Sequence, residues 1–133
     1  MAARIARHQA RRPGHWRLIE EPLHLARVLQ EQAAPERCVL VDCLTLWLTN
    51  LACWDNNARF TQERDDFLDT LPALPGYIIL VSNEVGMGIV PLGELSRRFS
   101  DEAGCLNQAV ARICERVTLT IAGLPFPLKQ APA

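Results

Sequence analysis

Lysine is almost absent from this sequence, which has 133 residues and a single lysine, Lys129, near its end. A phosphate-binding P-loop has the form G-x-x-x-x-G-K-[ST], in which the lysine contacts the phosphates of a nucleotide. None of the seven glycines begins that pattern. Residues 1–133 therefore contain no P-loop, which excludes this way of holding a nucleotide within them.

Long apolar runs, net charge and cysteine motifs are lacking as well. No segment has the ~20 uninterrupted apolar residues of a membrane span, and a net charge of −1 gives no general attraction for nucleic acid or an anionic membrane. The five cysteines are an odd number without a C-x-x-C spacing, which argues against a disulfide framework or a zinc site. Free thiols favour a reducing, cytoplasmic location.

The apolar residues that are present follow alternating strand and helix patterns within one domain. Continuous apolar runs, typical of parallel strands covered on both faces, predict strands at 38–42, 77–82 and 117–123. A short strand at 15–19 and an edge strand in the Pro-rich tail are also expected. Helical spacing predicts helices at 1–10, from Pro22 to Pro35, at 44–54, at 60–71 and, in one or two pieces, at 93–117.

This alternation predicts an α/β fold with a mostly parallel sheet and flanking helices. Ligands of such sheets bind beyond the carboxyl ends of the strands. Asp42 and Glu84 both follow apolar runs, so both are expected at that edge. Asp42 is placed either to bind magnesium or a nucleotide, or to cap the helix that follows.

The stretch VSNEVGMGIVP (81–91) has two interpretations. In one it is a tight solvated turn. In the other it is a functional loop, in which Gly86 and Gly88 allow close approach to a ligand or positive φ, and the apolar side chains line a pocket. The many apolar residues around Glu84 favour the functional loop.

His8 lies in a basic segment without acids, among Arg4, Arg11 and Arg12. A neutral imidazole can attack phosphorus while arginines hold the phosphate oxygens. Residues 4 and 8 share a face if the segment is helical. From the residues alone, a solvated basic helix is the favoured explanation of this pattern.

Three segments taken together, 1–16, 39–51 and 81–111, resemble the bifunctional adenosylcobinamide kinase/adenosylcobinamide-phosphate guanylyltransferase family of cobalamin biosynthesis. Segment 81–91 is similar to the family's V-[ST]-N-E-V-G-x-G-I-V-P. The family's second motif is matched by Arg98-Phe99-Ser100-Asp101, Gly104 and Asn107-Gln108, with Ser100 where arginine is usual.

The resemblance implies a P-loop NTPase-like (RecA-like) fold. Because residues 1–133 contain no P-loop, the chain is expected to be a single domain that lacks the family's first strand, P-loop and first helix. A natural truncation, a misplaced start codon or a gene fragment would each give this sequence. Without those parts the chain is expected to be weakly active at best.

The implied activities are phosphorylation of adenosylcobinamide and transfer of GMP from GTP to adenosylcobinamide phosphate through a GMP-histidine intermediate. The implied cofactors and substrates are GTP, ATP and Mg²⁺, and the implied assembly is a homo-oligomer, by family a trimer. The resemblance places the catalytic histidine on His8 and nucleotide-binding positions on Gln9, Ala10, Arg11, Arg12, Glu20 and Asp42, with Asp42 also a magnesium ligand. The resemblance also implies that seven further residues are candidates for substrate binding or for the functional loop: Asn83, Glu84, Gly86, Gly88, Arg98, Asp101 and Asn107.

Two other functions remain open from the sequence. The chain could be a non-catalytic remnant that binds nucleotide or associates with intact homologous subunits. It could also be an unrelated α/β binding module, which requires the two motif matches to be coincidental.

Overall fold

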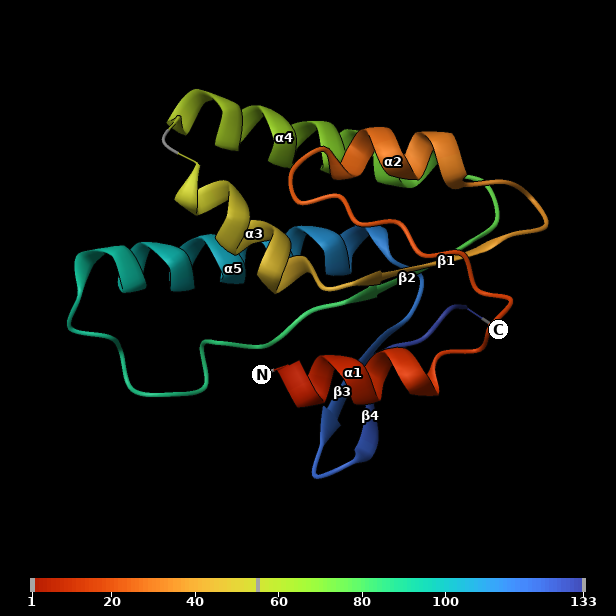
Figure 1. Cartoon of the computed structure of the whole chain (residues 1–133). Coiled ribbons are helices and arrows are strands. Elements are labelled where there is room, and N and C mark those ends of the chain that lie inside the picture. Colours follow the sequence, from red (N-terminus) through yellow and green to blue (C-terminus); the bar gives the residue numbers. More distant parts are fainter. Residues whose placement is uncertain (1, 55, 133) are drawn as a thin grey trace.

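The computed structural model describes residues 2–54 and 56–132 and confirms the predicted alternation of helices and strands. Figure 1 shows α2, α3, α4 and α5 on one side of β1 and β2, whereas α1, β3 and β4 lie on the other. The elements in chain order are α1 (Ala2–Arg11), α2 (Leu25–Gln32), β1 (Cys38–Asp42), α3 (Leu44–Cys53), α4 (Asn57–Thr70), the 3₁₀ turn η1 (Leu71–Ala73), β2 (Tyr77–Val81), α5 (Glu94–Ile113), β3 (Val117–Ile121) and β4 (Leu124–Lys129).

The parallel pair β1–β2 carries the strand ends at which a ligand was expected. Asp42 is in register with Val81, so the two carboxyl ends lie side by side. Exposure alternates along both strands. Inward residues such as Val41 and Leu80 pack against the helices, while Leu40 and Ile79 face solvent. The prediction that these strands are covered on both faces is therefore wrong for this chain.

The second pair, β3–β4, is antiparallel and forms a separate two-stranded sheet. The sequence predicted both strands but placed them in one mostly parallel sheet. Within the described residues no strand joins β1–β2 to β3–β4. Local apolar patterns identify strands but do not specify their neighbours, which explains the difference.

The core lies among α2, α3, α4 and α5. In the predicted helical segment 60–71, Phe60, Phe67 and Leu71 are buried. The Trp47 ring packs edge-on against Phe67 with 5.1 Å between centroids, and Trp47 Nε1 donates to the Leu23 carbonyl at 2.8 Å. Helix α5 is continuous, so of the two alternatives for this segment the single helix is the one observed.

The segment between α1 and α2 is irregular. The strand predicted at 15–19 is absent, because the chain turns there, with the Trp16 N–H donating to the Pro13 carbonyl at 3.0 Å. Helix α2 begins at Leu25 and not at Pro22.

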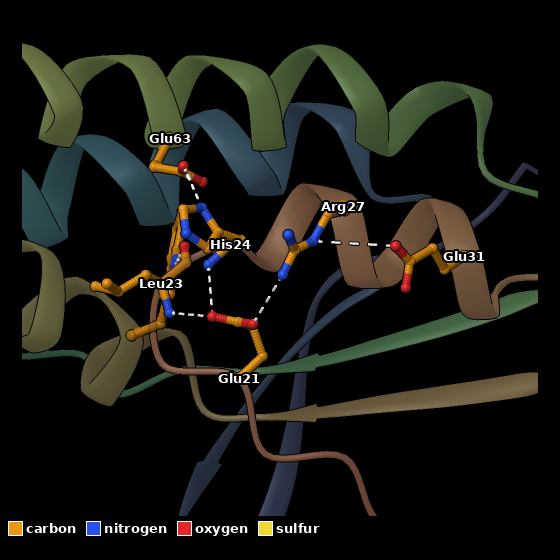
Figure 2. A network of polar contacts seen from close by, with 7 residues as sticks. Glu21, Leu23, His24, Arg27, Glu31 and Glu63 are labelled. Atoms are coloured by element: carbon orange, nitrogen blue, oxygen red, sulfur yellow. Dashed lines mark hydrogen bonds and ion pairs between the residues drawn. The ribbon is translucent and has the colours of Figure 1, made fainter.

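The Glu21 carboxylate binds the segment just before α2, as Figure 2 shows. Glu21 Oε1 accepts from the N–H groups of Leu23 and His24 at 2.9 and 3.0 Å. The hydrogen bond from the His24 N–H has the largest effect and, with that from the Leu23 N–H, lowers the pKa of Glu21. The Glu21 carboxylate is therefore charged at neutral pH. His24 Nδ1 in turn lies 2.7 Å from Glu63 Oε1, which joins the start of α2 to α4.

Gly76 closes the turn before β2 at a position that only glycine fits. Its φ is +79°, and a Cβ atom there would lie against the Ala34 carbonyl oxygen and 2.6 Å from that of Arg37. The Arg37 carbonyl already accepts from the Tyr77 N–H at 2.9 Å. This turn therefore aligns the entries of β1 and β2.

No helix in the described part of the chain combines the length and apolarity needed to cross a membrane.

Candidate functional site

Asp42 is the last residue of β1, and its side chain is 53% exposed. The helix that follows is capped by Cys43, whose Sγ accepts from the Leu46 N–H at 3.4 Å. Asp42 is thus not the helix cap, and this alternative from the sequence is wrong. Its carboxylate remains available at the strand edge where α/β proteins bind ligands.

His8 lies next to this carboxylate, although 34 positions separate the two residues in the sequence. The distance from His8 Nε2 to Asp42 Oδ2 is 3.8 Å, and the His8 side chain is 69% exposed. That distance is too long for a hydrogen bond but short enough for electrostatic attraction to a positively charged ring. The pair is accessible to a ligand from solvent.

The other predicted nucleotide-binding residues surround this pair less tightly. Gln9, Ala10 and Arg11 are exposed on α1, Arg12 is half-buried just after it, and Glu20 is exposed in the irregular segment. Within residues 2–54 and 56–132 no side-chain hydrogen bond or ion pair connects these residues to His8 or Asp42. The structure thus brings together His8 and Asp42 but not the remaining set.

The turn after β2 is held by side chains from two helices. Thr45 Oγ1, in the first turn of α3, accepts from the Asn83 N–H at 2.9 Å. On α5, Asn107 Oδ1 accepts from the Ser82 hydroxyl at 2.7 Å, and Asn107 Nδ2 donates to the Asn83 carbonyl at 3.2 Å. Thr45 and Ser82 were not identified from the sequence as candidate site residues. They could have been found there because each carries a hydroxyl group within three positions of the end of a strand.

The loop beyond this turn does not form the expected pocket. Glu84 Oε1 accepts locally from the Gly86 N–H at 2.8 Å. Neither Gly86 nor Gly88 has positive φ, and a Cβ atom at Gly88 would meet nothing within 4 Å. The following side chains do not wall a cavity, because Ile89 is 98% exposed and Met87 also faces solvent.

Arg98 and Asp101 are not at the strand edge. Arg98 Nη2 donates to Asn57 Oδ1 at 2.9 Å, at the start of α4, and lines a small cleft between α3, α4 and α5. Asp101 is exposed on α5. Of the motif residues on α5, Asn107 alone has a described side-chain hydrogen bond to the turn at 82–83. The helix runs from α4, where Arg98 lies, toward the strand edge, which Asn107 reaches.

Magnesium was expected at Asp42. Among the described residues no group of three or more His, Cys, Asp or Glu side chains could hold a metal ion. Magnesium in nucleotide enzymes usually takes one or two carboxylates and completes its shell with phosphate oxygens and water. A single exposed carboxylate at a strand end fits an ion of that kind.

Comparisons with known proteins show which family this chain is related to. Residues 1–128 match the family described as cobinamide kinase / cobinamide phosphate guanyltransferase. A bifunctional adenosylcobalamin biosynthesis protein, CobP, of Pseudomonas aeruginosa is 63% identical over 132 residues, which cover 99% of this chain and 76% of that protein. Proteins named bifunctional adenosylcobalamin biosynthesis protein CobU from Escherichia coli and Salmonella typhimurium are 36% and 38% identical, each over 97% of this chain and 78% of their own length. The chain therefore belongs to the cobinamide kinase / cobinamide phosphate guanyltransferase family.

Proposed function

We propose that this chain transfers GMP from GTP to adenosylcobinamide phosphate through a GMP-histidine intermediate on His8. The observation that carries the proposal is the 3.8 Å separation of His8 Nε2 and Asp42 Oδ2, both exposed, at the carboxyl end of β1. A histidine nucleophile needs access to its substrate and stabilisation of charge, and this arrangement supplies both.

The chemistry follows from these groups. A neutral imidazole nitrogen of His8 attacks the α-phosphorus of GTP, the bond to the β-phosphate oxygen breaks, and pyrophosphate leaves. The ring is cationic until it loses its remaining N–H proton, and the Asp42 carboxylate stabilises that charge. A phosphate oxygen of the acceptor then attacks the phosphorus, the P–N bond breaks, and adenosylcobinamide-GDP forms.

The surrounding residues have supporting roles in this proposal. Arg11, Arg12 and Gln9, with the Ala10 backbone and Glu20, would bind the nucleotide, since guanidinium groups pair with phosphate oxygens. Asp42 would also hold Mg²⁺, which would neutralise triphosphate charge.

Labelling with α-³²P-GTP tests the proposal. The chain is expected to acquire acid-labile label, and His8→Ala is expected to abolish it. His15→Ala is the matched control, since His15 is another exposed histidine shortly after α1. Label that persists in His8→Ala would refute the assignment. Nucleotide binding without any label would instead favour the non-catalytic remnant.

We further propose that the kinase step and the complete sheet need a strand and P-loop that residues 1–133 do not contain, so that the chain alone phosphorylates adenosylcobinamide weakly at best. The one lysine supports this, because Lys129 Nζ donates to the Ala111 and Arg112 carbonyls at 3.0 Å and so caps α5. The strand would lie centrally and pair with the edges of β1–β2 and β3–β4, and the helix after the P-loop would cover the exposed apolar face of β1–β2.

Adding a strand, P-loop and helix before residue 1 tests both parts of this proposal. The extended chain is expected to unfold at a higher temperature and to transfer γ-phosphate from ATP or GTP to adenosylcobinamide. If neither property changes, the added segment does not complete this fold.

We also propose that the exposed apolar loop faces the acceptor, because a corrinoid has a large, partly apolar body and the loop continues directly from the strand edge at Glu84.

By family the chain would form a homo-oligomer, a trimer, which sedimentation of a monomer alone would contradict. A cytoplasmic location is supported by the five free thiols; recovery of disulfide-linked chain from cells would contradict it.

A further inference from the structure

Thr45 and Asn107 hold one short turn from opposite sides. The Asn83 N–H donates to the Thr45 hydroxyl, and the Asn83 carbonyl accepts from the Asn107 amide. The neighbouring Ser82 hydroxyl donates to the same Asn107 side chain. One peptide segment is thus fixed by residues that lie 24 to 38 positions away in the sequence.

This clamp of Thr45 and Asn107 fixes the position of the turn more than it adds to the stability of the fold. Ser82 and Asn83 are exposed, so water can replace the lost partners and the net contribution of each bond to stability is about 1 kcal/mol. What water cannot replace is position. Three directed hydrogen bonds specify where the turn lies relative to α3 and α5.

The clamp lies between two parts of the proposed site. On one side is Asp42, three positions before Thr45, with His8 beside it. On the other side is the exposed apolar loop, in which Ile89 and Leu92 are 98% and 97% exposed. The far end of that loop is also held, because Arg97 Nη1 donates to the Pro91 and Leu92 carbonyls. The loop is therefore anchored at both ends while its apolar side chains remain open to solvent.

We propose that Thr45 and Asn107 are positioning residues for the second half-reaction, in which GMP passes from His8 to the acceptor. This inference rests on the proposed function and assigns different residues to its two half-reactions. The first half-reaction uses His8 and Asp42, which the clamp does not contact. The second requires the acceptor phosphate to meet GMP-His8, and the clamp sets the distance between the acceptor-facing loop and that centre.

Single-turnover kinetics separate the two steps. Each chain is labelled with α-³²P-GTP, freed of nucleotide and mixed with adenosylcobinamide phosphate, and the loss of label from His8 is followed. Thr45→Val and Asn107→Leu are expected to label within about twofold of the parent but to discharge at least ~10-fold more slowly, since small misplacements of reacting groups are costly in rate. Thr45→Ser keeps the hydroxyl and should restore discharge to within about threefold of the parent.

Thr49→Val is the matched control. Thr49 lies one turn further along α3, and its hydroxyl donates to the Thr45 carbonyl of the same helix at 2.8 Å, so both steps should be unchanged. Discharge of Thr45→Val and Asn107→Leu at the parent rate would overturn the inference and leave the proposed function intact. An equal loss of labelling and discharge would show a general structural role and also overturn it. A parent chain that acquires no label at His8 would overturn both.

Discussion

Replacing Gly76 by alanine is expected to lower the free energy of unfolding by about 3–6 kcal/mol. The residue has φ of +79°, and a Cβ atom would approach two backbone carbonyl oxygens, those of Ala34 and Arg37. Backbone cannot move aside as the end of a flexible side chain can. The turn before β2 would have to shift away from the 34–37 segment.

The expected loss has three physical sources. A residue other than glycine pays about 1–2 kcal/mol for the left-handed region. The overlap with the carbonyl oxygens adds strain of about 1–3 kcal/mol. The shift also weakens the bond from the Tyr77 N–H to the Arg37 carbonyl, which contributes about 1 kcal/mol. Urea denaturation followed by circular dichroism measures the sum.

Gly104→Ala is the control for this change. Gly104 lies within α5, and a Cβ atom there would meet nothing within 4 Å. Alanine in a helix interior is favoured over glycine by about 1 kcal/mol, so this variant should be as stable as the parent or more so. Equal stability of both variants would mean that the 34–37 segment does not pack on Gly76 as described.

Asp42→Asn is expected to slow the labelling of His8 by α-³²P-GTP by about 100-fold or more. The substitution keeps the shape of the side chain and removes the charge that faces the His8 ring across 3.8 Å. It also weakens the proposed magnesium ligand. Because Asp42 is half exposed and does not cap α3, the unfolding midpoint should change little.

A remote exposed carboxylate provides the comparison for this prediction. Asp69→Asn makes the same chemical change on α4, where the residue is exposed, and should leave labelling within about twofold of the parent because screening weakens distant charges. If Asp42→Asn labels at the parent rate, the carboxylate does not stabilise the attack of His8, and its nearness to the ring has no catalytic consequence.

Two exposed apolar surfaces of this fold are each proposed to be covered by another segment or molecule. The outer face of β1–β2 and the loop after Glu84 both present large apolar side chains to solvent, including Ile79 and Ile89. Exposed patches of this kind usually mark surfaces that another molecule or segment covers. Here the proposed coverings differ: a completing strand and helix for the sheet face, and the corrinoid acceptor for the loop.

Several parts of this protein could be predicted from the sequence because they depend on local patterns. The apolar periods placed α1, β1, α3, α4, β2 and α5 close to their observed bounds. The same patterns put Asp42 at the end of one strand and Glu84 shortly after another, and the shared parallel edge then followed from strand geometry. The motifs at 1–16, 39–51 and 81–111 were sufficient to indicate the family that the comparisons show.

The remaining features depended on contacts between distant segments, which no local pattern encodes. An irregular segment after α1 brings His8 to Asp42, and the packing of α3 and α5 brings Thr45 and Asn107 to Asn83. The apolar loop illustrates the same limit, since its composition predicted a pocket wall, yet Ile89 and Leu92 are almost fully exposed and no element among the described residues covers them. The amino-acid sequence was enough to indicate most of the elements, the family and the residues capable of chemistry. Which of these residues meet depends on tertiary packing, because hydrophobic periodicity specifies the inward face of an element but not its neighbour.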